Sequence, residues 1–153
     1  MYFTPAQLIA MALGILSIAA TVGLDLRLLR TSGLGFTVLE GVYYIVALAA
    51  LVIGWYFNFQ YIDQYGANAS WTNWTEQLFV NPAAASGGQD LLFANVVLFP
   101  LWTIIDGRRI GLRAAWLYFP MSVFTSYAFA VALYLALRER QVRWNALQGK
   151  ATI

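Results

Sequence analysis

Four long segments of this chain carry almost no charge, and this feature limits the fold more than any other. The first segment is expected at residues 6–23, within the apolar stretch LIAMALGILSIAATVGL. A membrane-spanning helix needs about 20 consecutive, mainly apolar residues. The other segments are expected at residues 36–59, 90–105 and 114–137. The sequence therefore predicts an all-α integral membrane protein folded as a four-helix bundle.

Composition supports a membrane location for most of the chain. Of the 153 residues, 61% are hydrophobic and only 10% are charged, against roughly 25% charged residues in an ordinary soluble domain. Four spans and their connections leave no room for a separate soluble domain. We therefore expect residues 1–153 to form a single transmembrane domain, with a basic tail at 138–153.

The residue types that are missing exclude several classes of function. The chain has no Cys and no His, so it lacks thiolate nucleophiles, the commonest metal ligand and the usual general base near neutral pH. These absences argue against metalloenzymes, haem carriers and Ser-His hydrolases. We expect no catalytic residue, no cofactor and no metal site.

Residues 60–89 form the one long connection, which contains acids but no Lys or Arg. Asn73 and Glu76 fit the spacing of a capping box at a helix start. We expect a short helix on the membrane surface that presents Trp71, Trp74 and Phe79 to the bilayer or to a partner. The Asn81-Pro82 pair should end this helix, and residues 83–88 should be flexible.

Charged residues flank the third predicted span. Asp90 is expected at its helix start, where the helix dipole favours a carboxylate. After the span, Asp106 stands close to three arginines, and Asp106-Gly107 could form a helix C-cap. This cluster could bind anionic lipid headgroups or a partner's acidic loop, or it could simply anchor the topology. Its basic members are Arg108, Arg109 and Arg113.

Glu40 lies about one turn inside the second predicted span, and a carboxylate at membrane depth is a functional-site hypothesis by default. It could relay a proton, bind a cation or pair with a partner's arginine. It could also play a structural part by reaching the headgroups or an arginine on the same side. The candidate arginines for that pairing are Arg27, Arg30 and Arg113.

In the four-span arrangement, the two sides of the membrane carry nearly equal numbers of basic residues. Five basic residues would lie on the side of the two short loops and four on the side of the long loop and both termini. Loops rich in Lys and Arg stay in the cytoplasm, and the first helix usually dominates the outcome. Because two arginines follow the first span and no basic residue precedes it, we expect both termini outside a bacterial inner membrane.

Four motifs give the chain a resemblance to a family of small bacterial multi-pass membrane proteins that is known only as a domain of unknown function. The resemblance is strong from about residue 74 to residue 140 and weaker over the second span. It implies a helical membrane fold, to whose usual three spans the first span is an addition, and it implies no activity. The motifs are Leu78-Phe79-Val80-Asn81-Pro82, Asp90-Leu91-Leu92, Gly107-Arg108-Arg109-Ile110-Gly111 and Leu135-Ala136-Leu137-Arg138-Glu139-Arg140.

These observations favour a non-catalytic accessory subunit of a larger membrane complex, such as a lipid or solute transporter. Stripes of small residues, for example Gly14, Ser17 and Thr21, allow another helix to approach closely. The expected partners are a larger integral membrane protein and membrane lipids, not nucleic acid. Two alternatives remain: an enzyme acting on lipid or isoprenoid substrates within the bilayer, and a small oligomeric channel or carrier.

Overall fold

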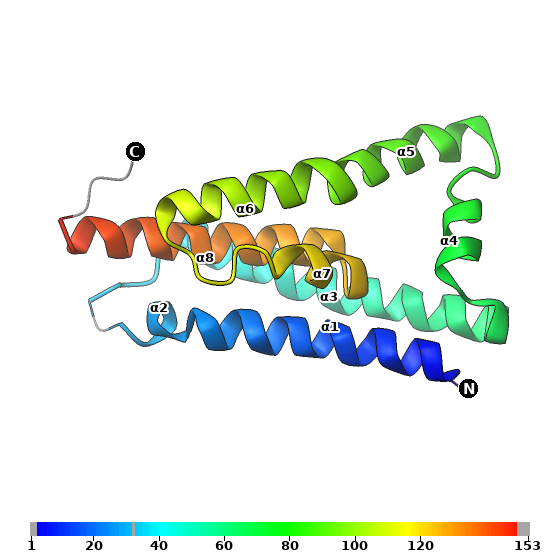
Figure 1. Cartoon of the computed structure of the whole chain (residues 1–153), viewed down its shortest axis with the longest axis horizontal. Coiled ribbons are helices and arrows are strands. Elements are labelled where there is room, and N and C mark those ends of the chain that lie inside the picture. The colour runs from blue at the N-terminus through cyan, green and yellow to red at the C-terminus, as the bar shows by residue number, and fades with distance from the viewer. Residues whose placement is uncertain (1–2, 32, 150–153) are drawn as a thin grey trace.

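The computed structural model describes residues 3–31 and 33–149, and this part of the chain contains helices and no strands. Figure 1 shows the helices running along the long axis of the molecule, with α4 bridging the end where α3 and α5 diverge. The helices are α1 (Pro5–Leu24), α2 (Leu26–Arg30), α3 (Val38–Tyr65), η1 (Gly66–Asn68), α4 (Trp71–Gln77), α5 (Pro82–Leu92), η2 (Phe93–Leu98), α6 (Phe99–Ile110), α7 (Tyr118–Phe124) and α8 (Tyr127–Leu147).

Three of the helical segments in the described part are long and apolar enough to cross a membrane: Pro5–Leu24, Val38–Asn68 and Pro82–Ile110. Local sequence explains where they begin. Thr4 and Gln7 form a capping box at the start of α1, and the side chain of Thr37 accepts a hydrogen bond from the Glu40 amide at the start of α3. The first two predicted spans are therefore confirmed as long helices, and the third is longer than expected.

The third long helix contains a π-helical turn, η2, in the middle of its length. Pro100 lies just after this turn and has no amide hydrogen to donate to a residue one turn earlier. A wider turn before a proline accommodates that loss, and π-helical turns interrupt α-helices in this way. The helix is therefore widened before Pro100 and does not end there.

The predicted fourth span, residues 114–137, is not one helix but a hairpin of two. α7 ends at Phe124, and Ser126 caps a new helix, α8, by accepting a hydrogen bond from the Phe129 amide. The turn packs against two glycines: a Cβ on Gly14 would lie 2.8 Å from the Phe124 carbonyl oxygen, and a Cβ on Gly54 would lie 3.1 Å from the Ser126 Cβ. Both glycines lie well inside their helices, so the hairpin turns back about halfway along α1 and α3.

This hairpin changes the arrangement of the chain ends. Figure 1 shows α7 starting beside the end of α6, and α8 returning to that same end. The start of α1 and the end of α8 therefore lie at opposite ends of the molecule, where a four-span bundle would place them together. α8 also continues to Leu147, so the tail extends the last helix as far as that residue, and residues 150–153 lie outside the described part.

The long connection is more helical than expected, and its caps differ. Ser70, not Asn73, caps α4 by accepting from the Asn73 amide. Asn81 caps α5 with Pro82 in its first turn, so this pair starts a helix and residues 83–88 lie inside it.

Two further expectations about helix ends are wrong. Asp90 lies near the end of α5, within the third long helix, and not at a helix start. The left-handed C-cap of α6 is Gly111, with φ of 87°, and not Gly107. Gly107 instead packs closely against Ala115, in the connection from α6 to α7. A Cβ on Gly107 would lie 2.6 Å from the Ala115 Cβ.

Candidate functional site

Glu40 is completely buried and is held by arginines of α8. Its carboxylate pairs with the Arg140 guanidinium, and Arg143 Nη1 lies 3.3 Å from its second oxygen. Arg140 also donates to the Leu28 carbonyl at 2.9 Å, and Arg143 donates to the Gly35 carbonyl at 2.7 Å. The pairing with Arg27, Arg30 or Arg113 that the four-span arrangement allowed does not occur, because the hairpin brings the tail arginines to the Glu40 end.

Asp25 is a second completely buried carboxylate, at the junction of α1 and α2. It accepts hydrogen bonds of 3.2 Å from the backbone amides of Arg113 and Ala114, which fixes the connection from α6 to α7. Arg27 lies 4.0 Å from it and donates to the Gly111 carbonyl at 2.8 Å. Burial, together with the nearby Arg113, lowers the pKa of Arg27, while Asp25 opposes this shift.

Asp106 is also engaged within the fold and is not free to recognise a ligand. Arg138 donates to its two oxygens at 2.7 and 3.1 Å, and the Tyr134 hydroxyl donates to it at 2.5 Å. This bidentate geometry joins α6 to α8. In the cluster expected from Asp106, Arg108, Arg109 and Arg113, the carboxylate therefore pairs with Arg138 of α8 and with none of these three arginines.

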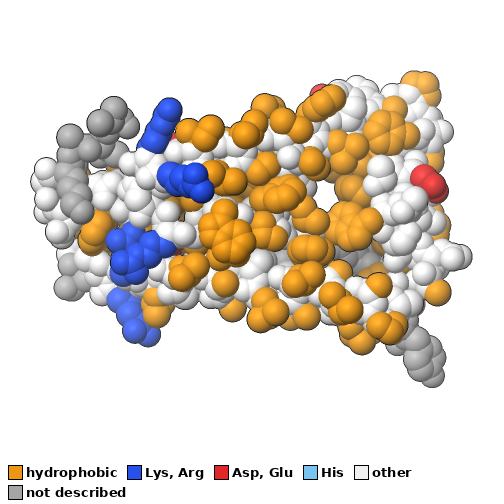
Figure 2. Space-filling model, viewed as in Figure 1, with side chains coloured by type: hydrophobic (Ala, Val, Ile, Leu, Met, Phe, Trp, Pro, Cys, Tyr) orange, Lys and Arg blue, Asp and Glu red, His pale blue; other side chains and the backbone are white. Residues whose placement is uncertain are grey.

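The four remaining arginines form an exposed group that we call the basic face: Arg30, Arg108, Arg109 and Arg113. None of their guanidinium groups makes an ion pair or hydrogen bond within the described residues. Figure 2 shows arginine side chains gathered at one end of the molecule and apolar side chains covering most of the rest of this view. The basic face can bind phosphate or carboxylate groups, because a guanidinium can donate to two oxygens at once.

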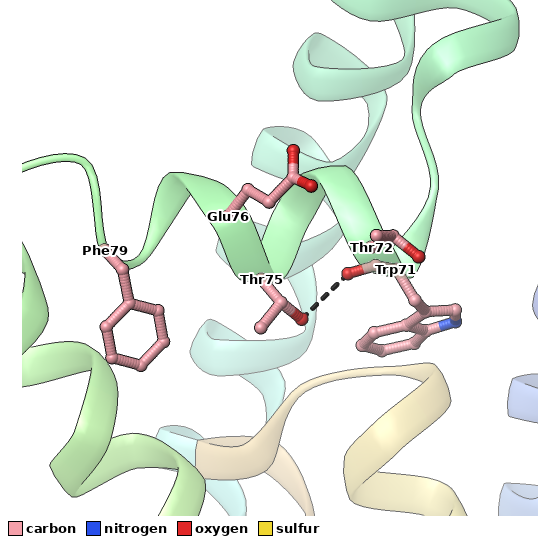
Figure 3. Close-up of a pocket in the computed structure, with 5 residues that line it drawn as sticks. All are labelled: Trp71, Thr72, Thr75, Glu76 and Phe79. Atoms are coloured by element: carbon pink, nitrogen blue, oxygen red, sulfur yellow. Dashed lines mark hydrogen bonds between the residues drawn. The ribbon is translucent and has the colours of Figure 1, made fainter.

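The aromatic candidates lie at the opposite end, on and after α4. Figure 3 shows Trp71 and Phe79 on the same side of α4, while the Glu76 carboxylate points to the other side. Trp71 packs edge-on against Trp74 and Phe124, with ring centroids 5.7 and 6.4 Å apart. The aromatic side chains of α4 therefore lie at the end of the bundle that faces the turn between α7 and α8, where Trp71 contacts Phe124.

The structure thus divides the predicted site residues into two separate groups. Glu40, Asp106, Arg108, Arg109 and Arg113 lie at one end, and Trp71, Trp74 and Phe79 lie at the other. Sequence reasoning missed the partners of the buried acids, namely Arg138, Arg140 and Arg143. The spacing of Arg140 and Arg143 was a usable signal, because residues three apart lie on one face of a helix and can reach the same acid.

Comparison with known proteins gives a family and no activity. A family model described as "Protein of unknown function DUF2834" matches residues 42–140 of the chain. No curated protein and no solved structure matches it. The match includes most of α3, all of α4 to α7 and part of α8, and it therefore covers the hairpin and most of the arginines described above.

Proposed function

Since the chain belongs to the DUF2834 family, whose description assigns no activity, we propose from its geometry that it is a non-catalytic accessory subunit of a larger membrane complex, such as a lipid or solute transporter. The observation that carries this proposal is that the buried acids hold the fold together. A general acid or base needs a carboxylate that can reach a substrate proton. Glu40 is enclosed by two arginines, and Asp25 is bound by backbone amides.

The basic face supplies the contact with the rest of the complex. Its four arginines are exposed, and Trp116, which is 57% exposed, follows Arg113 in the connection before α7. Arg and Trp are the residue types that most often dominate binding energy at protein interfaces. The partner surface that suits this face is an acidic loop of a larger integral membrane protein.

Charge distribution supports one orientation in a bacterial inner membrane. All eight arginines lie in segments at the end where α1 finishes and α6 and α8 end, whereas the connection through α4 has no Lys or Arg. The four-span arrangement divides the basic residues almost equally between the two sides. The α7–α8 hairpin removes this near equality, because it returns the arginines of the tail to the end that holds the others. The positive-inside rule then favours the basic face and the end of α8 in the cytoplasm, with α4 outside.

Affinity purification from the native membrane in mild detergent, followed by mass spectrometry, tests the proposal. We expect a larger integral membrane protein to co-purify at fixed stoichiometry. Recovery of the chain as a homo-oligomer without such a partner would contradict it.

Substitution of the basic face tests where the partner binds. We expect the pair Arg108→Gln and Arg109→Gln to lower partner recovery at least tenfold, and the matched pair Arg108→Lys and Arg109→Lys, which keeps the charge, to lower it less. Loss of co-purified anionic phospholipid with the partner retained would instead assign this face to lipid headgroups. The enzymatic alternative predicts that Glu40→Gln changes the membrane lipid profile at normal expression, and we expect no such change.

A further inference from the structure

The α7–α8 hairpin fills only part of the space between the three long helices, and a cavity of about 630 Å³ lies beyond its tip. α1 packs on α7 and α3 packs on α8 in the half nearer the basic face. Past Gly54, α3 continues for eleven residues to Tyr65, which is about 17 Å of helix, without a hairpin beside it. Figure 2 shows the surface hollowed at this end, away from the arginines.

The walls of this cavity are mainly apolar and carry no charged residue. They come from the first half of α1, the last half of α3, α4, the junction of α5 with η2, and the hairpin tip, and none of the lining residues is Asp, Glu, Lys or Arg. A charged ligand would lose its hydration there without a counter-charge, which is strongly unfavourable. The aromatic lining residues are Trp55, Phe57, Phe59, Tyr61, Trp71, Trp74, Phe124 and Tyr127.

Two amide side chains near the hairpin tip give the cavity a polar floor. Asn58 lies one turn past Gly54 on α3, and its amide has no hydrogen-bond partner among the described residues. The oxygen of Asn95 accepts from the Ser122 hydroxyl at 2.5 Å, which leaves its amide hydrogens available. Asn58 is exposed and Asn95 is half-buried, so both amides are open to the cavity and can hydrogen-bond to a ligand that carries its own donor or acceptor atoms.

We propose that this cavity binds a neutral, single-chain amphiphile, whose hydroxyl or ester group meets Asn58 and Asn95 and whose hydrocarbon chain lies along the aromatic walls. The cavity volume lies within the range of small-molecule sites, about 300–1,000 Å³. Such a molecule is either an acylglycerol of the membrane or an isoprenoid alcohol. This binding site is independent of the basic face and of any partner complex.

Quenching of tryptophan fluorescence by a brominated amphiphile tests the proposal on the full chain in phosphatidylcholine nanodiscs. Trp55, Trp71 and Trp74 line the cavity. We expect dibrominated monoolein to quench their emission with a saturable component, and dibrominated stearate, in its ionised form, to show at least tenfold weaker saturable binding. Competition by unbrominated monoolein or by farnesol distinguishes the acylglycerol source from the isoprenoid source.

Matched variants locate the saturable component. Ala10→Phe fills the cavity, whereas Ala20→Phe adds the same ring to an exposed position of α1 that does not line it. We expect the saturable quenching to be lost in A10F and kept in A20F. Asn58→Leu removes a floor amide without adding bulk and should weaken binding at least tenfold, which keeps the test decisive if A10F does not fold.

Three results would overturn the proposal. They are non-saturable quenching of equal size in the native chain, A10F and A20F; saturable binding of the ionised stearate as tight as that of monoolein; and failure of both competitors to displace the probe. Loss of the partner complex with this binding intact would leave the cavity proposal standing and remove only the proposed accessory function.

Discussion

A buried carboxylate held by arginines from a distant helix is the feature that most determines stability at the residue scale. Glu40 has no exposed surface and pairs with Arg140 and Arg143. Removing one partner of a buried pair leaves the other charge without compensation, which costs about 3–5 kcal/mol. Glu40 therefore joins α3 to α8 as a structural residue.

We expect Glu40→Leu to lower the free energy of unfolding by about 3–5 kcal/mol, because Arg140 then remains buried without its anion. Thermal unfolding in detergent, followed by intrinsic tryptophan fluorescence, measures the change. Glu139→Leu is the matched control, since Glu139 is partly exposed and makes no ion pair within the described residues. Equal effects of the two substitutions would show that the buried pair is not structural.

The burial cost of Glu40 could be predicted from the sequence, but its partners could not. An acid one turn inside an apolar segment needs a counter-charge, and that requirement is visible without a structure. The identity of the counter-charge depends on which segments share an end of the bundle. If residues 114–137 formed one helix, Arg140 and Arg143 would lie at the other end from Glu40, whereas the turn between α7 and α8 brings them to it.

At the scale of the elements, the hairpin depends on small residues that let its turn approach α1 and α3. Gly14 faces the Phe124 carbonyl and Gly54 faces Ser126. The small-residue stripe of Gly14, Ser17 and Thr21 is buried within the chain. The sequence predicts that another helix can approach this stripe closely, and in the structure that helix is α7.

We expect Gly14→Ala to destabilise the protein by about 1–3 kcal/mol, because its Cβ would lie 2.8 Å from the Phe124 carbonyl oxygen and the turn must shift. Gly23→Ala, on the same helix, meets no atom within 4 Å. That control should be neutral or stabilising by up to about 1 kcal/mol, since alanine is the better helix former. The midpoints of thermal unfolding in detergent give both values, and a Gly14→Ala protein as stable as the Gly23→Ala protein would refute the close approach.

Sequence patterns indicated the helical content of residues 114–137 but not the turn inside it. The end of segment 118–124 and the start of segment 127–147 are both apolar, so the hydropathy of the sequence shows one continuous apolar stretch. The available signal was local: Ser126 is a good N-cap residue. Such a signal is weak, because Ser and Thr also occur inside membrane helices, where they hydrogen-bond to the backbone one turn back. Thr125 forms a bond of this type, to the Met121 carbonyl.

At the scale of the whole molecule, the hairpin gives the bundle two different ends. One end holds the arginines and the acids Asp25, Glu40 and Asp106, and the other holds the acidic connection, the aromatic side chains of α4 and the cavity. The total charge could not reveal this difference, because the division of arginines between the two sides depends on the number of spans.

Labelling of single cysteines in intact cells tests this arrangement, and the chain has no native Cys to remove. Thr72→Cys lies on α4 and Gln148→Cys follows α8. We expect a membrane-impermeant maleimide to label Thr72→Cys in intact cells and Gln148→Cys only after permeabilisation. Labelling of both positions in intact cells would contradict this arrangement and favour the four-span one, in which the long connection and the C-terminal tail lie on the same side of the membrane.

The partnership of Glu40 with Arg140 also sets an order of events during synthesis. The two residues are separated by 100 positions, and bacterial ribosomes add roughly 5–20 residues per second. For about 5–20 seconds, therefore, α3 exists with its carboxylate but without the arginines that neutralise it. During that interval we expect Glu40 to stay hydrated near the bilayer surface, so that α3 reaches its final depth only when the last helix arrives.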